Sequence, residues 1–192
     1  MTADAALLAA LADCAAALRH LGRPAMIIGG LAVIARGLPR QTVDIDATIW
    51  AEGPGVETIL PALAAHGFIP RTADAVSFAQ EHHVLLLRHE PTGTPLELIL
   101  AYLPFERSAL ERAELIDFGG VTVAAATAED LIVYKTVAWR DRDRSDVERL
   151  LALHGRSIDL ARIRGIVREF ATALDEPERI DEFEALVKRT LG

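Results

Sequence analysis

Hydrophobic residues recur along the first part of the chain in two patterns, one at helical spacing and one in short runs. Residues 4–20 carry apolar side chains at helical spacing and predict a docked amphipathic helix. The apolar runs Ala25–Ile28 and Val43–Trp50 predict two buried strands. Between these strands, Leu31–Arg36 predicts a helix that Gly37 ends.

The same mixture of short elements continues to about residue 125. We expect helices at Val56–His66 and Phe105–Arg112, with a turn at Gly53-Pro54-Gly55 before the first of them. Short strands are expected at Phe68–Ile69 and Val76–Phe78. Two hairpins should pair Val84–Arg88 with Pro95–Leu100 and Ile116–Phe118 with Val121–Ala124. His82 and His83 adjoin a strand in this interpretation, so their side chains should point to opposite faces and make a poor metal pair.

The pattern changes at Thr127, which predicts an N-cap followed by the acids Glu129 and Asp130 in the first helical turn. From there the chain is helical in pattern, with breaks at His154-Gly155 and near Pro177. We therefore expect an α/β core over residues 1–125 and a helical region over residues 126–192 that packs on it.

Composition narrows the class of protein. Of the 192 residues, 51% are hydrophobic and 25% charged, which is typical of a globular chain. The single cysteine, Cys14, excludes an internal disulfide and favours the cytoplasm, and no apolar run is long enough to predict a membrane span. The net charge of −8 argues against non-specific nucleic-acid binding over the whole surface but leaves room for a local basic patch.

Two acids, Asp44 and Asp46, stand one residue apart within the second apolar run. On a strand they share a face, with Cα atoms ~6.5–7 Å apart, and carboxylates at this spacing can share Mg²⁺ ions. The alternative is a polar strand end that carries two exposed acids. Glu97, in the strand pattern PLELIL, is a candidate third ligand or general base; its alternative is a charged residue on the solvent face of a strand.

The pair Gly29-Gly30 lies between the first strand and the next helix, where backbone N–H groups can approach a phosphate. It is neither a P-loop, because the downstream Gly-Lys-[Ser/Thr] is missing, nor a GxGxxG motif. Arg40 and Thr42 follow and could also contact phosphate, although Arg40 could instead pair with the acids.

A basic cluster opens the helical region. Lys135 lies in an otherwise apolar helix and could reach a triphosphate as a point charge. Arg142, Asp143 and Arg149 are expected on a solvated helix face with pairs at i,i+3 and i,i+4. The two tryptophans, Trp50 and Trp139, are expected in the core or in a pocket wall and not as platforms for nucleic-acid bases.

Three segments together, GGLAVIARGLPRQTVDID, LEL and EDLIVYKTVAWRDRDRSDVERL, resemble the DNA polymerase β type of nucleotidyltransferase. Within that superfamily the chain is most similar to the AbiEii/MenT-like bacterial proteins, the toxins of type IV toxin–antitoxin pairs. The resemblance spans roughly residues 25–150. It implies an α+β nucleotidyltransferase fold, with a mixed central sheet flanked by helices and a helical C-terminal part.

The resemblance also implies a site. Asp44 and Asp46 match the paired metal ligands, Glu97 the third acid and Lys135 the triphosphate-binding lysine. The glycine pair, Arg40, Thr42, Arg144 and Asp146 complete the implied nucleotide site. Two positions depart from the family pattern, because Leu31 stands where many members have Ser and Glu97 stands where Asp is common.

The leading hypothesis is a two-metal nucleotidyltransferase of the EC 2.7.7 type that uses Mg²⁺ or Mn²⁺. It would transfer a nucleoside monophosphate from an NTP to a hydroxyl of a tRNA, a protein or a small molecule. As a toxin it would also have an antitoxin protein as partner. The alternative is a non-catalytic NTP-binding or partner-binding module on the same fold, and neither hypothesis involves a membrane.

Overall fold

The computed structural model describes residues 5–51 and 55–192. Contacts between Cα atoms divide the chain into two compact units. The first comprises Met1–Ala35 and Pro39–Ala126, and the second comprises Arg36–Leu38 and Thr127–Gly192. The predicted packing of the helical region on the core stays a prediction.

The described part of the first unit contains a seven-stranded mixed sheet in the order β3-β4-β5-β2-β1-β7-β6. Its elements are α1 (Ala5–Leu21), β1 (Ala25–Ile27), α2 (Gly29–Ala35), β2 (Ile45–Trp50), α3 (Val56–Ala64), β3 (Phe68–Pro70), α4 (Ala75–His82), β4 (Val84–His89), β5 (Pro95–Ala101), α5 (Pro104–Arg112), β6 (Glu114–Phe118) and β7 (Val121–Ala125). The pairs β2–β5 and β1–β7 are parallel and the other four are antiparallel. The predicted mixed sheet with flanking helices is therefore confirmed.

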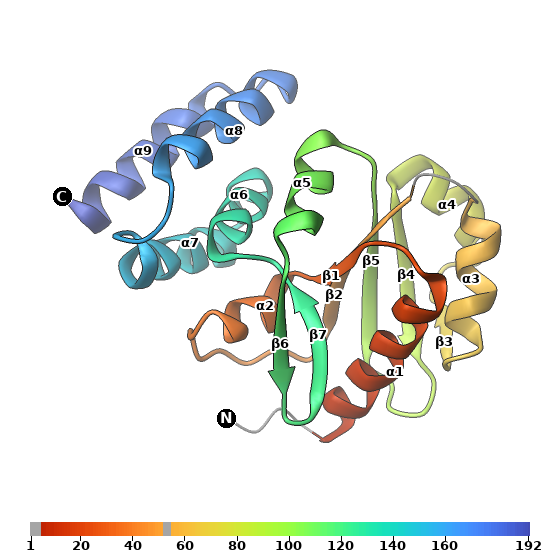
Figure 1. Ribbon diagram of the computed structural model, residues 1–192. Helices are drawn as coiled ribbons and strands as arrows, with labels where there is room; N and C mark the ends of the chain where they lie inside the picture. The colour runs from red at the N-terminus through yellow and green to blue at the C-terminus, as the bar shows by residue number, and fades with distance from the viewer. Residues whose placement is uncertain (1–4, 52–54) are drawn as a thin grey trace. The chain divides into compact units, whose positions relative to one another are not determined.

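The core of this unit lies under one face of the sheet. The buried residues of β2 include Ile45, Ala47 and Ile49, and those of β5 include Leu96, Leu98 and Leu100. Helices α1, α3 and α4 contact one another in that order beside the strands (Figure 1). Asp46 and Glu97, at the intervening positions, are more exposed, so the period-2 pattern turns these acids away from the core.

One expected strand is wrong, and so is the expected placement of His82 and His83 on a strand. Val76–Phe78 lies within α4 and forms no strand, because Asp74 caps this helix by accepting a hydrogen bond from the Ser77 N–H (3.0 Å). His82 ends the helix and His83 takes the left-handed conformation after it (φ 53°), so the two histidines do not alternate on a strand. The two expected hairpins form, while Gly53 and Pro54 of the expected turn lie outside the described residues.

The second unit contains α6 (Ala128–Ala138), α7 (Asp141–His154), α8 (Leu160–Ala173) and α9 (Glu178–Leu191). The predicted cap forms, since the Thr127 hydroxyl oxygen accepts from the Asp130 N–H (3.2 Å). The breaks at His154 and Pro177 are confirmed, but a further break at Trp139 and Arg140 separates α6 from α7. Arg36 belongs to this unit, and its carbonyl oxygen lies 2.8 Å from His154 Nε2.

No helix within the described residues is both long and apolar enough to cross a membrane. Cys14 is buried in α1, and burial raises the pKa of its thiol to about 12, so the thiol stays protonated and unreactive.

Candidate active site

The glycine pair lies in direct contact with Asp46. A Cβ at Gly29 would overlap the Asp46 carboxylate, and Gly29 has a positive φ of 58°. The Gly30 N–H donates a weak hydrogen bond to Asp46 Oδ2 (3.4 Å). Glycine is therefore required at position 29 both by the backbone and by the acid that rests on it.

Gly30 is covered in turn by Arg40 and Thr42. A Cβ at Gly30 would overlap the Thr42 side chain and would lie 3.5 Å from the Arg40 guanidinium carbon. The Thr42 hydroxyl donates to Asp44 Oδ1 (2.7 Å). The structure thus gathers six of the residues that the sequence singled out: Gly29, Gly30, Arg40, Thr42, Asp44 and Asp46.

Glu97 joins this group through strand register. Asp46 of β2 is the Cα partner of Glu97 on the parallel strand β5. Paired residues on neighbouring strands are ~4.8 Å apart and project from the same face of the sheet. The two acids are therefore neighbours on that face, and the Glu97 side chain is exposed.

The carboxylates suit a hard divalent cation in their chemistry, because Mg²⁺ prefers oxygen ligands. The Asp46 carboxylate also lies so close to Gly29 that no residue with a Cβ would fit at position 29. As the side chains lie, however, no three His, Cys, Asp or Glu residues within the described ranges gather closely enough to hold a metal ion. Asp44 and Asp46 instead accept hydrogen bonds from Thr42 and Gly30.

In the second unit, Lys135 is buried among acids. Its Nζ lies 3.0 Å from Asp143 Oδ1 and 2.9 Å from Asp146 Oδ2, and all three side chains are at most 7% exposed. Arg140 Nε lies 2.6 Å from the other oxygen of Asp143. Lys135 and Asp146 are thus brought together by α6 and α7, with their predicted role in nucleotide binding still a prediction.

Asp143 corrects one of the expectations. We expected it on a solvated helix face, but it is 1% exposed. Asp143, Asp146, Val147 and Leu150 share the buried face of α7, and their spacing of i, i+3, i+4 and i+7 could have indicated this. Burial alone would raise the pKa of the Asp143 carboxyl, but hydrogen bonds from Arg140 and Lys135 outweigh burial and hold this pKa below its ordinary value.

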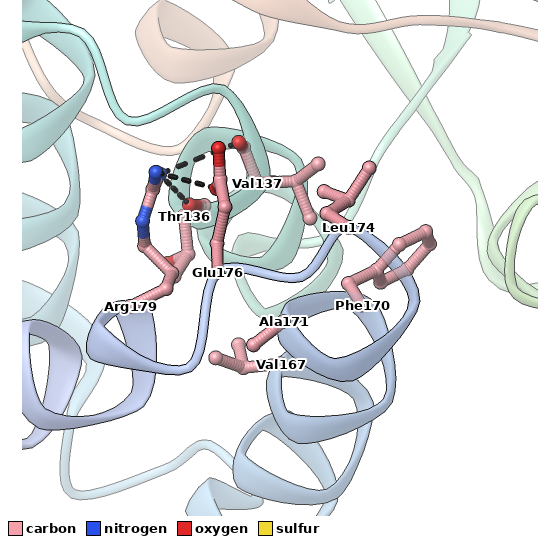
Figure 2. A pocket seen from close by; sticks show the side chains of 8 residues that line it. All are labelled: Thr136, Val137, Val167, Phe170, Ala171, Leu174, Glu176 and Arg179. Atoms are coloured by element: carbon pink, nitrogen blue, oxygen red, sulfur yellow. Dashed lines mark hydrogen bonds and ion pairs between the residues drawn. The ribbon is translucent and has the colours of Figure 1, made fainter.

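Arg179 holds the end of α6 that carries Lys135. Its guanidinium donates to the carbonyl oxygens of Thr136 (3.0 Å) and Val137 (3.4 Å) and pairs with Glu176 (2.7 Å), as Figure 2 shows. Trp139, buried in the left-handed conformation that ends the helix, has Arg179 and Arg144 5.4 and 5.6 Å from its ring centroid. Trp139 therefore belongs to the core, as expected, while Arg144 is exposed.

Comparison with known families gives a match over most of the chain. The sequence profile of a family described as "Nucleotidyltransferase of unknown function (DUF6036)" matches residues 6–189. No curated protein sequence matches the chain.

Solved structures share the fold at low sequence identity. A solution structure of the antibiotic-resistance factor ANT(2'')-Ia superposes with a TM-score of 0.58 at 17% identity, over 94% of this chain and all of the other. A crystal structure of ANT(2'')-Ia with adenylyl-2''-tobramycin gives 0.52 at 17%, over 83% and 93%. An antigenic nucleotidyltransferase-like protein from Paracoccidioides brasiliensis gives 0.54 at 15%, over 91% and 92%.

These similarities confirm the predicted α+β nucleotidyltransferase-like fold with its helical C-terminal part. At such identities they establish the fold alone. Neither the matched family nor any of these three structures is described as a toxin.

Proposed function

The chain belongs to this family of nucleotidyltransferases of unknown function, and from that premise we propose that it transfers a nucleoside monophosphate from an NTP to a hydroxyl acceptor with divalent metal. The observation that carries the proposal is the packing of Gly29 and Gly30 against Asp46, which is itself in register with Glu97. A backbone suited to phosphate and two acids thus lie at one place in the sheet.

In the proposed reaction the acceptor oxygen attacks the α-phosphorus of the NTP and forms a phosphodiester, while the bond to the bridging oxygen breaks and pyrophosphate leaves. Asp44, Asp46 and Glu97 would hold the metal, which when bound would neutralise charge on the phosphate oxygens. Glu97, as the exposed acid, is the candidate to accept the proton of the hydroxyl. Gly30, Arg40 and Thr42 would contact phosphate, with Lys135, Arg144 and Asp146 as further nucleotide-binding residues.

For the acceptor we favour a small polar molecule over a tRNA. The chain matches ANT(2'')-Ia along the whole of that protein, and one ANT(2'')-Ia structure holds adenylyl-2''-tobramycin. The net charge of −8 also suits a small cationic acceptor better than a large RNA. The alternative is a toxin of the AbiEii/MenT-like kind, which would modify a protein or a tRNA and bind an antitoxin. These observations do not favour it.

A specific observation favours a second candidate, an NTP-binding module without catalysis. Asp44 and Asp46 each accept a hydrogen bond from the chain, and the described residues contain no gathered set of three ligands. If the acids keep these contacts when NTP binds, the protein would hold the nucleotide and leave it unchanged.

The test measures pyrophosphate release and transfer of label from each α-labelled NTP, with Mg²⁺ or Mn²⁺, to a panel of aminoglycosides and to a cell lysate. We expect Asp44→Asn, Asp46→Asn and Glu97→Gln each to lower turnover at least about 100-fold, the size of effect seen when transition-state stabilisation is removed. The matched control is Glu90→Gln, which changes an exposed acid in the β4–β5 turn and should turn over as wild type.

Each outcome separates the candidates. Label in an aminoglycoside or another small molecule supports the favoured acceptor, and label in a tRNA or protein supports the toxin-like alternative. NTP binding with no pyrophosphate release, whatever the acceptor, supports the module without catalysis. Unchanged turnover in Asp46→Asn would overturn the proposed metal site.

A further inference from the structure

The first unit contains a cavity of about 480 Å³ that the proposed reaction does not use. Its lining residues lie at the ends of β2 and β5, in and just after α4, and at the start of α3. Trp50, which lines it, is four residues beyond Asp46 on the same strand, so the cavity is roughly 13 Å along β2 from the candidate metal ligands. Its volume is within the range of small-molecule sites in proteins.

Aromatic rings form the walls of this cavity. The rings of His83 and Tyr102 lie 4.3 Å apart between centroids at an angle of 38°, and Trp50 contributes a third ring. The guanidinium of Arg107 lies 5.0 Å from the Trp50 centroid. The floor is apolar and buried, and consists of Val56, Ala79 and Leu100.

The backbone that carries the walls is held in place without a ligand. The buried Glu106 carboxylate accepts hydrogen bonds from the N–H groups of Tyr102 and Leu103, both at 2.9 Å. His83 is fixed from both sides, since its N–H donates to Ala79 O (2.9 Å) and its carbonyl accepts from the Leu100 N–H (2.8 Å). A preformed site of this kind loses little entropy when a rigid ring enters it.

Charge defines which ligand the cavity suits. None of the described residues that line it is Asp, Glu, Lys or Arg, and their polar side-chain groups are the Gln80 amide, the Tyr102 hydroxyl, the His83 ring nitrogens and the Trp50 indole N–H. The nearby cation, Arg107, is already paired with Glu111 at 3.0 Å. The described lining residues therefore suit a flat neutral ring with hydrogen-bonding atoms at its edge, and they include no cationic side chain that would pair with a phosphate.

We propose that this cavity binds a small neutral molecule with a heteroaromatic ring, of the kind found in nucleosides, at a site separate from that of the NTP. The ring would stack against Tyr102 and His83 while its polar edge meets Gln80. The proposal does not depend on the transferase activity.

The test is calorimetric titration of the full-length protein with adenosine, guanosine, cytidine and uridine, with cyclohexanol as a probe that has no aromatic ring. We expect binding of at least one nucleoside and none of cyclohexanol. Tyr102→Ala and His83→Asn, of which the second keeps a residue that tolerates the left-handed conformation, should each weaken the affinity about 3- to 10-fold. The control is Leu115→Ala, which truncates an exposed residue of β6 outside the cavity.

Competition with Mg²⁺–ATP separates this site from the proposed NTP site and uses the wild-type chain, so it does not depend on how a variant folds. Nucleoside binding that persists in saturating ATP supports a separate site. Displacement by ATP, no binding of any of the four nucleosides at millimolar concentration, or equal affinity in Tyr102→Ala, His83→Asn and wild type would each overturn the proposal.

Discussion

Asp46 makes contacts that an acid on a solvated strand end would not make. Its carboxylate rests on Gly29 and accepts from the Gly30 N–H, and its Cα partner on β5 is Glu97. The residue types of this group could be predicted from the sequence because each carries a recognisable constraint: glycine for close approach, and acids at alternate positions for a shared face. Asp143 was missed because a charged residue in an Arg/Asp run reads as solvated, although its spacing to Val147 and Leu150 indicates the buried face of the helix that carries it next to Lys135.

Replacement of Gly29 tests the contact with Asp46. Gly29→Ala introduces a Cβ at φ 58° and directly against the carboxylate, and we expect it to abolish turnover and to destabilise the protein by about 2 kcal/mol or more. The matched control is Gly93→Ala, at φ 75° with open space around the new Cβ, which should suffer the backbone strain alone and keep its turnover. Urea unfolding and pyrophosphate release measure both effects, and equal losses in the two variants would contradict the contact.

At the scale of elements, α6 and α7 are joined by the ion pairs of Lys135 with Asp143 and Asp146. The sequence indicates one helical stretch here, whereas the structure turns at Trp139 and Arg140. The turn brings the acids of α7 back onto Lys135, which a pattern read along one helix does not reveal. The sequence also predicts the wrong type of element at α4, where Val76–Phe78 reads as a strand. A short apolar run suits a strand or a helix, and the Asp74 cap decides for the helix.

Asp143 should make the free energy of unfolding depend on pH. Because its folded-state pKa is lowered, its contribution is present above the unfolded value of about 3.9 and is lost as the pH falls through the folded-state value. Asp143→Asn should destabilise the protein by about 1.5–3 kcal/mol at pH 7, since Lys135 loses one charged hydrogen-bond partner but keeps Asp146. The difference from wild type should shrink below pH 4.

Urea unfolding from pH 7 to pH 2.5 measures this dependence. Asp141→Asn is the control, because Asp141 is fully exposed in the same helix and should behave as wild type at every pH. A constant difference between Asp143→Asn and wild type over this range would contradict the assigned role of the carboxylate.

At the scale of the whole molecule, the candidate residues are shared between two units. The glycines, Arg40, Thr42 and the three acids of the proposed metal site belong to the first unit, and Lys135, Arg144 and Asp146 belong to the second. If the acids of the first unit hold the metal of a bound NTP, as we propose, nucleotide should stabilise the native protein against unfolding by an amount that rises with its affinity.

Thermal unfolding tests this linkage. Mg²⁺–ATP at about 100 times its dissociation constant should stabilise the protein by about 2.7 kcal/mol, and removal of metal with a chelator should abolish most of this gain. Asp46→Asn should lose the gain that depends on metal, while Glu90→Gln should keep it. A full gain in the presence of chelator would show that the nucleotide binds without the carboxylates.

The sequence by itself predicted the strands of the described sheet, with one more that is helical, and most of the helices, because these depend on local periodicity and on glycine. It also picked out the candidate site residues, because the glycine pair and the spacing of acids along one strand are local patterns. Only the tertiary structure decided what depends on chain segments far apart in sequence. The register of β2 with β5 pairs Asp46 with Glu97, the turn after α6 buries Lys135 between two acids, and the meeting of strand ends with α4 creates an aromatic cavity. Such contacts arise from non-local packing, which no local pattern specifies.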